Sequence, residues 1–269
     1  MQSGTSKTCV QCGSEVLTAF CPVCGQRSDV KRLTLRDTVE DLWSNLAGLD
    51  GLFLRTLKEL TRRPGLVALS YIRGVRTRYF GPIAYFFLMI TLLLLWVSIL
   101  GMDFAELIRD RQQDITGSSP TQPGAAVITK LFSDNIKWVL FLAVPFQALV
   151  ARHILFRKSG YNLIEQMVPL FYISGHLFWL TMLMFLIKKV AGELYSAPAM
   201  IFSLAYFGFV YQDLMRYQSR LKAFVKGCLV YLGGQILFVV VLVIVIVISV
   251  VVLALINPDA LEAFRPTNQ

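Results

Sequence analysis

Four cysteines within 16 residues are the clearest chemical feature of this 269-residue chain. They form the pattern C-x2-C-x8-C-x2-C at Cys9, Cys12, Cys21 and Cys24, and a glycine follows the second and the fourth. Each C-x-x-C pair turns two thiolates toward one ion, and glycine supplies the positive φ that such a turn needs. The motif therefore predicts a structural Zn²⁺ site in a small zinc ribbon.

Two other chemistries fit the same spacing less well. Iron in an S4 site remains open, and so does a redox-active cysteine pair, although no βαβ pattern surrounds the motifs. A catalytic zinc would need an open coordination position, which four cysteines leave no room for. We expect metal binding to fold the ribbon, because so few residues cannot bury a core.

The rest of the chain has the composition of a membrane protein. It is 55% hydrophobic and only 16% charged, against about 25% charged residues in ordinary soluble domains. Five segments approach the roughly 20 apolar residues that cross a bilayer. They are 83–100, 136–156, 167–187, 194–215 and 236–256. The fourth is the least apolar, and without it the count is four.

Charge distribution predicts the orientation of these spans. The formal net charge is +9. With the N-terminus inside, the inner segments hold most of the Lys and Arg residues and the outer segments are nearly neutral, as the positive-inside rule requires. We therefore expect a cytoplasmic N-terminus and a periplasmic C-terminus. The same bias explains the basic composition without a nucleic-acid partner.

Between the ribbon and the first span, residues 34–62 predict two amphipathic helices, with a new start at Asp50 and a break at Pro64–Gly65. They pack on the bundle or lie in the interface, or alternatively bind a partner. The predicted division is a ribbon over 1–27, juxtamembrane helices over 28–81, a helix bundle over 82–256 and a tail over 257–269. The fold class is an all-α polytopic membrane protein with about five spans.

Outside the cysteines, two groups of residues are candidates for binding. Arg73, Arg76 and Arg78 precede the first span, as topological signals or as a site for lipid headgroups and other anions. His176 and Gln147 lie within predicted spans, where polar groups are costly and often functional. His176 is a candidate proton relay or ligand, or a neutral imidazole hydrogen-bonded across a helix interface. A structural role next to Pro145 is favoured for Gln147.

Three stretches carry a family resemblance: FCPVCGQ, LDGLFLRTLKELTRRPG and YIRGVRTRYFGPIAYF. Together they resemble an uncharacterised bacterial family that joins a zinc ribbon to a multi-helix membrane domain and is known only as a domain of unknown function. The resemblance covers about residues 9 to 95. It implies a protein of the bacterial inner membrane and assigns no catalytic residue.

Three functions remain open from the sequence. The favoured one is a non-enzymatic adapter or assembly factor, embedded among anionic lipids, whose ribbon docks a protein partner. The alternative is a transporter or scramblase for lipids or small solutes that uses the arginine cluster. An enzyme acting on lipid phosphates is a third option, although no nucleophile motif or P-loop is present.

Overall fold

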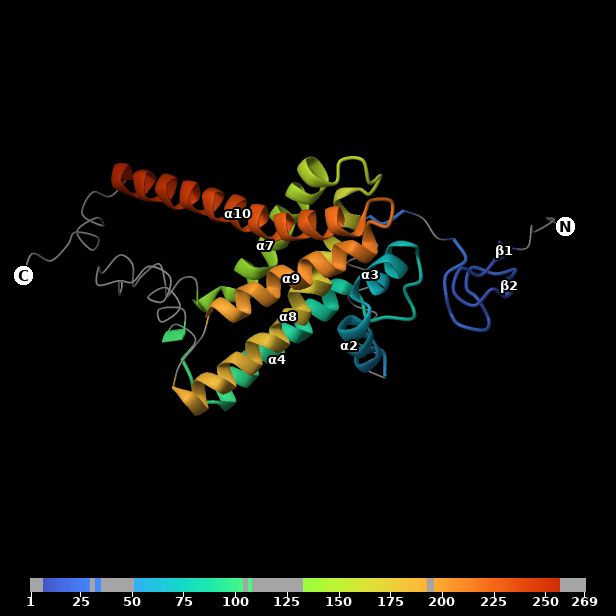
Figure 1. Cartoon of the computed structure of the whole chain (residues 1–269), viewed down its shortest axis with the longest axis horizontal. Helices are drawn as coiled ribbons and strands as arrows, with labels where there is room; N and C mark the ends of the chain where they lie inside the picture. Colours follow the sequence, from blue (N-terminus) through green and yellow to red (C-terminus); the bar gives the residue numbers. More distant parts are fainter. Residues whose placement is uncertain are drawn as a thin grey trace, which may run out of the picture.

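The computed structural model describes residues 7–29, 32–34, 51–103, 106–107, 133–192 and 196–256. Within these ranges the chain is mainly helical, with one small antiparallel pair of strands near the N-terminus (Figure 1). The strands are β1 (Lys7–Thr8) and β2 (Glu15–Val16). The helices are α2 (Leu52–Arg62), α3 (Pro64–Ile72), α4 (Pro82–Ile99), α7 (Ile136–Val150), the π-helical turn η1 (Ala151–Leu155), α8 (Leu163–Ala191), α9 (Ser196–Leu214) and α10 (Arg220–Ile256).

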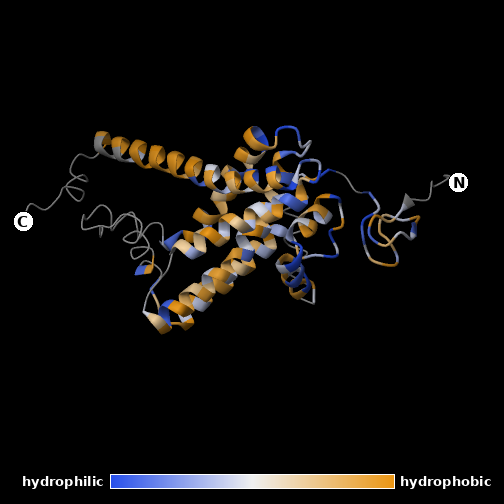
Figure 2. Cartoon of the chain, in the orientation of Figure 1, coloured by the Kyte–Doolittle hydropathy of each residue, from blue (hydrophilic) through white to orange (hydrophobic). Residues whose placement is uncertain are grey.

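Among the described residues, four helical segments are long and apolar enough to cross a membrane. They are Pro82–Ile99, Ile136–Leu155, Leu163–Ala191 and Arg220–Ser249. Each contains or overlaps one of the predicted spans, so four of the five predictions are confirmed at this level. Figure 2 shows α10 as an almost uninterrupted apolar rod whose C-terminal half leaves the bundle. Its valine and isoleucine side chains are exposed there, which indicates lipid as their surroundings.

The remaining predicted span, 194–215, forms a helix whose mean hydropathy is lower than that of these four segments. This helix, α9, packs against α10, α3 and α8. Its C-terminal half carries Tyr206, Tyr211, Gln212 and Asp213, which lower its mean hydropathy. The fifth crossing therefore stays a prediction.

Helix α8 begins four residues before the predicted span because a capping box fixes its start. The Glu165 backbone N–H donates to Asn162 Oδ1, and the Asn162 N–H donates back to Glu165 Oε2, both at 2.7 Å. Gly192 follows the last helical residue, Ala191, and its φ of 78° is the left-handed conformation common at helix C-termini. A capping box and a glycine, which an apolar pattern does not reveal, thus set the two ends of α8.

The segment that precedes the first membrane helix is bound tightly to the bundle. Tyr206 donates its hydroxyl to the Leu60 carbonyl (3.0 Å), and Tyr172 donates to the Phe80 carbonyl (2.6 Å). Thr56 Oγ1 accepts from the Phe80 N–H at 2.8 Å. The predicted second amphipathic helix is α2, and it packs on the protein itself. The predicted first amphipathic helix, within 34–46, lies almost wholly outside the described residues, as does the tail after Ile256.

Glycines mark the close contacts between helices. A Cβ at Gly175 of α8 would lie 3.2 Å from Phe86 Cα of α4, and one at Gly227 of α10 would lie 2.9 Å from Gly208 Cα of α9. Small residues allow such approaches, which lipid-embedded helices use in place of hydrophobic association. Around these contacts the core includes many aromatic side chains, such as Phe86, Phe171 and Tyr172.

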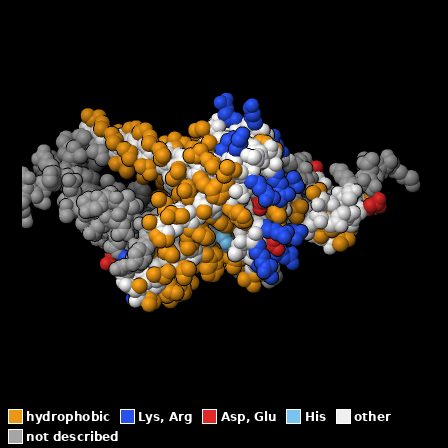
Figure 3. All heavy atoms as spheres, in the orientation of Figure 1, with side chains coloured by type: hydrophobic (Ala, Val, Ile, Leu, Met, Phe, Trp, Pro, Cys, Tyr) orange, Lys and Arg blue, Asp and Glu red, His pale blue; other side chains and the backbone are white. Residues whose placement is uncertain are grey.

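Positive charge gathers at one end of the bundle. Figure 1 places the starts of α4, α8 and α10 at this end, together with the α2–α3 pair. In Figure 3 a band of Lys and Arg side chains separates the apolar surface from the N-terminal part of the chain. We call this end the basic face. The N-terminal strands lie beyond it, away from the apolar surface (Figure 1).

Candidate metal centre

Residues 7–29 form two similar turns, and we call this unit the cysteine module. In each turn the glycine N–H donates to the carbonyl of the first cysteine, and that cysteine's N–H donates to a carbonyl five residues later. These bonds join Gly13 to Cys9 and Cys9 to Ser14 in one turn, and Gly25 to Cys21 and Cys21 to Gln26 in the other, at 2.7 to 3.0 Å. Both glycines have a φ of 70° or more, so the glycine in each motif is required by the turn.

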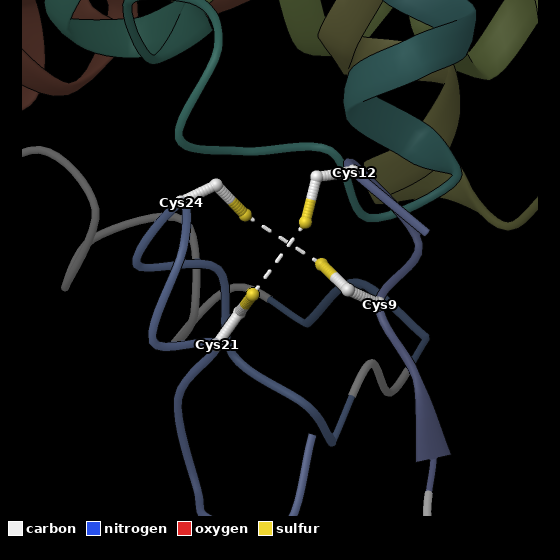
Figure 4. A group of neighbouring side chains, drawn as sticks. All are labelled: Cys9, Cys12, Cys21 and Cys24. Carbon is white, nitrogen blue, oxygen red and sulfur yellow. Dashed lines mark hydrogen bonds between the residues drawn. The ribbon is translucent and has the colours of Figure 1, made fainter. Parts of the chain in front are cut away.

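The four sulfur atoms converge on one point (Figure 4). All four lie within 4.8 Å of one another, with Cys9 Sγ 3.6 Å from Cys24 Sγ and Cys12 Sγ 3.5 Å from Cys21 Sγ. A tetrahedral ion with bonds of about 2.3 Å to sulfur needs sulfur atoms about 3.8 Å apart. The four cysteines can therefore hold a metal ion with only small adjustments.

The surroundings favour the thiolate form at Cys12 and Cys21. Ser14 Oγ lies 2.9 Å from Cys12 Sγ and 3.2 Å from Cys21 Sγ. A hydrogen bond from the Ser14 hydroxyl lowers the pKa of Cys21 to about 6 and also lowers that of Cys12. A backbone hydrogen bond at Gln26 lowers the pKa of Cys24, but burial and the neighbouring cysteines raise it overall, to about 12. The thiolate is the form that binds metals, so the serine prepares the site for a cation.

A buried glutamine anchors the cysteine module to the bundle. Gln26 is 3% exposed, and its Nε2 donates to the Gly74 carbonyl at 2.7 Å. Its Oε1 accepts from the Arg76 backbone N–H at 3.2 Å and from the Thr77 hydroxyl at 3.3 Å. The Thr77 hydroxyl also donates to Gln11 Oε1. The Gln26 side chain, which follows the second cysteine turn, thus provides hydrogen-bond partners for two backbone groups of the α3–α4 loop.

A second anchor follows the cysteine module along the chain. Arg32 Nε and Nη2 each lie 3.0 Å from the Glu165 carboxylate, in a two-pronged ion pair at the start of α8. Asn162 Nδ2 donates to the Leu33 carbonyl at 3.2 Å, and the Leu33 side chain is buried in the main core. The capping box of α8 therefore also holds the chain that connects the module to the bundle.

The arginine cluster of the sequence analysis lies in this α3–α4 loop. Arg73 and Arg78 are exposed, and the Arg78 guanidinium lies 5.5 Å from the centre of the Tyr79 ring. Arg76 contributes its backbone N–H to Gln26. The loop thus supports the cysteine module, and binding of a headgroup by these arginines remains a prediction.

His176 of α8 contacts side chains of three other helices. Its Nδ1 lies 3.1 Å from the Tyr85 hydroxyl of α4, and its Nε2 lies 3.4 Å from Thr61 Oγ1 of α2. Its ring stacks on that of Tyr206 of α9, with centroids 5.5 Å apart. The groove beside it, about 480 Å³, is otherwise lined by apolar side chains such as Trp96, Trp179 and Phe202. This arrangement matches the structural alternative for His176, a hydrogen-bonded ring at a helix interface.

Gln147 is buried where α7 meets α10. A Cβ on Gly234 would lie 2.7 Å from Gln147 Cα, so the two backbones touch across this contact. Among the described residues, Gln147 Oε1 has no hydrogen-bond partner. Gln147 lies far along the chain from the cysteines and from the α3–α4 loop. No hydrogen bond within the described part of the chain links it to His176.

Sequence reasoning missed the residues that position the metal centre. Gln26, Arg32 and Glu165 were not singled out, because isolated polar residues carry no motif. One signal was present: an acid, Glu165, near the N-terminal end of an apolar stretch requires a partner. A second signal was that Ser14 and Gln26 occupy equivalent positions, each two residues after the last cysteine of its C-x-x-C motif.

Comparisons with known proteins add one match. Residues 50–94 match a family model described as a protein of unknown function (DUF3667). The match covers α2, α3 and most of α4, which is well under half of the chain and excludes the four cysteines. No curated protein and no solved structure shows a significant match.

Proposed function

We propose that this protein is an inner-membrane scaffold without enzymatic activity, in which a zinc-bound cysteine module docks a protein partner on the cytosolic side. The observation that carries the proposal is the buried Gln26 contact. It joins the module firmly to the membrane bundle, while apolar side chains of the same module remain exposed to solvent.

The basic face supports this orientation. Bacterial inner-membrane proteins keep Lys and Arg on the cytosolic side, and here these residues gather at the end of the bundle that carries the cysteine module. A reducing cytosol keeps the four thiols available for metal. If α9 crosses with the other helices, α10 ends on the periplasmic side. Packing of α9 along α10 supports this fifth crossing.

Zinc is the metal that the donor set favours. Four thiolates, a tetrahedral arrangement and no open coordination position are the properties of structural zinc sites. With all four positions filled by protein, the ion has no place for a substrate. Its role is to fold the module, which contains few buried apolar side chains of its own.

The exposed surface of the module indicates what kind of partner it binds. Four large apolar side chains are at least half exposed: Val10, Leu17, Phe20 and Val23. They lie on a unit beyond the basic face, away from the apolar belt that lipid covers (Figure 3). We therefore assign them to a water-soluble protein with an apolar docking surface.

Transport of lipids or small solutes has weaker support. A transporter would need a polar path from the basic face toward the membrane interior. The groove at His176 is lined by apolar side chains, and the α3–α4 loop is used to hold the cysteine module.

Photo-crosslinking in intact membranes tests the scaffold proposal. A photoreactive phenylalanine analogue at Phe20 of the full chain is expected to give one discrete protein adduct. The same analogue at Ile99, an exposed apolar residue at the end of α4, serves as the matched control and should not give that adduct. Adding Cys21→Ser should abolish the adduct, because the docking surface needs a folded module.

Two results would contradict the scaffold proposal. One is the absence of a discrete adduct from position 20. The other is an adduct that persists at full yield after Cys21→Ser, which would mean that no folded module is needed.

A further inference from the structure

A cationic pocket opens on the basic face between the end of η1 and the start of α10. Its volume is about 630 Å³. Four cations line it: Arg157 and Lys158 follow η1, and Lys222 and Lys226 lie one turn apart on α10. None of the described residues that line it carries a carboxylate. Four positive charges therefore surround one cavity and leave it strongly attractive to an anion.

The four cations are also available for a ligand. Among the described residues, none of them forms an ion pair with a carboxylate. Arg157, Lys158 and Lys222 have exposed side chains, and Lys226 is half-buried. Concentrating unpaired like charges destabilises the empty pocket, and a bound anion would relieve that repulsion.

Ring stacking and a backbone hydrogen bond hold part of the pocket lining in place. Phe156, which lines the pocket, stacks on Tyr211, with ring centroids 4.9 Å apart and planes 2° apart. Lys226 Nζ lies 5.4 Å from the centre of the Phe156 ring. The turn after Phe156 is held by the Ser159 N–H, which donates to the Phe156 carbonyl at 2.9 Å. Rigid placement lowers the entropy lost when a ligand binds.

The first turn of α10 lies beside the same cavity, which Ser219 and Lys222 line. The Ala223 N–H donates to the Ser219 carbonyl at 3.0 Å. The N–H groups of the preceding helical residues have no acceptor within the helix, and they carry the positive end of its dipole. Helix starts combined with Lys and Arg side chains are a common arrangement for phosphate binding.

We propose that this pocket binds a phosphate group, carried by an anionic phospholipid of the adjacent leaflet or by a soluble phosphate compound. Two exposed apolar residues, Ile154 in the lining and Leu221 on the first turn of α10, lie beside the cations and offer a surface for acyl chains. The site is separate from the α3–α4 loop, and it does not depend on the docking proposed for the cysteine module.

Lipid binding to the purified full chain tests this assignment. Native mass spectrometry counts copies of phosphatidylglycerol, which carries an anionic phosphate, against zwitterionic phosphatidylcholine. Lys222→Gln/Lys226→Gln removes two pocket charges and should weaken phosphatidylglycerol binding by about tenfold or more, because each cation near an anionic surface contributes substantially. Lys58→Gln/Arg62→Gln is the matched control, with the same spacing and charge change on exposed α2 residues, and should change binding less than twofold.

Competition with inorganic phosphate or glycerol 3-phosphate distinguishes the two carriers of the phosphate group, a phospholipid or a soluble compound. If millimolar concentrations of either displace phosphatidylglycerol from the wild-type protein but not from the pocket variant, the pocket binds phosphate whatever carries it. If neither displaces the lipid, and the pocket variant still loses it, the ligand is the phospholipid. Should the Lys222→Gln/Lys226→Gln variant fail to fold, the variant Arg157→Gln/Lys158→Gln, which removes the other two pocket charges, provides the same test. Equal phosphatidylglycerol binding by pocket and control variants, with no effect of phosphate, would overturn the assignment.

Discussion

Replacing Cys21 with serine is expected to remove the metal and unfold the cysteine module while the helices stay folded. Metal binding contributes about 10–16 kcal/mol to the folding of small thiolate sites, far more than this module can recover from its few buried apolar side chains. Metal analysis should fall from one zinc per chain to below about a tenth. Hydrogen exchange should rise throughout residues 9–26 and also at Arg76, whose N–H donates to Gln26.

The fifth cysteine provides a matched control for this change. Cys228 lies on α10, where its thiol donates to the Leu204 carbonyl at 3.3 Å, far along the chain from the other four. Cys228→Ser should keep one zinc per chain and leave exchange at Arg76 unchanged. Full zinc content in Cys21→Ser, or a module that remains protected without metal, would refute the assignment of the four thiols as its structural core.

Adding one methyl group at Gly234 is expected to separate α10 from α7. A Cβ there would lie 2.3 Å from Gln147 Cγ and 2.7 Å from Gln147 Cα, and a backbone atom cannot rotate away. Gly234→Ala should therefore cost near the upper end of the roughly 1–3 kcal/mol that overpacking costs. Reversible unfolding in mixed micelles measures the loss.

Gly233, one residue earlier on the same helix, is the control. A Cβ there would have only side-chain atoms of Val150 within 4 Å, the nearest at 3.1 Å. Because that side chain can shift, Gly233→Ala should cost less than about 1 kcal/mol. Equal losses for the two variants would show that general helix effects, and not the contact with Gln147, determine the cost.

Much of the membrane architecture was predictable, because it follows from apolar runs. The segments around α4, α7, α8 and α10 are visible as such in the sequence. The exact bounds were not: α8 starts at a capping box, and α10 starts at Arg220, well before its longest apolar run. The first turns of α10 pack on α9, where Gly227 lies against Gly208, and only the fold provides that partner.

The metal centre was predictable from its motif, but its position was not. Two C-x-x-C-G turns specify their own local hydrogen bonds, so the convergence of four thiols follows from residues 9–26 alone. Docking onto the α3–α4 loop depends on Gln26 and on two backbone groups and one hydroxyl 48 to 51 positions away. No residue type or spacing announces such a contact in one sequence.

The basic residues show the same difference between composition and arrangement. Their placement next to the membrane helices was expected from charge alone. That Lys222 and Lys226 face Arg157 and Lys158 across one pocket follows from the packing of α10 beside η1. The arginines that the sequence singled out instead lie in the loop beneath the cysteine module.

Thiol labelling on the two sides of the membrane tests the central claim most directly, namely that the metal-bound module lies on the cytosolic, basic face of the bundle. Leu17 of the module and Val190 at the far end of α8 are about equally exposed, at 79% and 81%. An impermeant maleimide should label Leu17→Cys only in inside-out vesicles and Val190→Cys only in intact cells, above the background of the unmodified protein. Labelling of Leu17→Cys in intact cells would place the module outside and contradict the account.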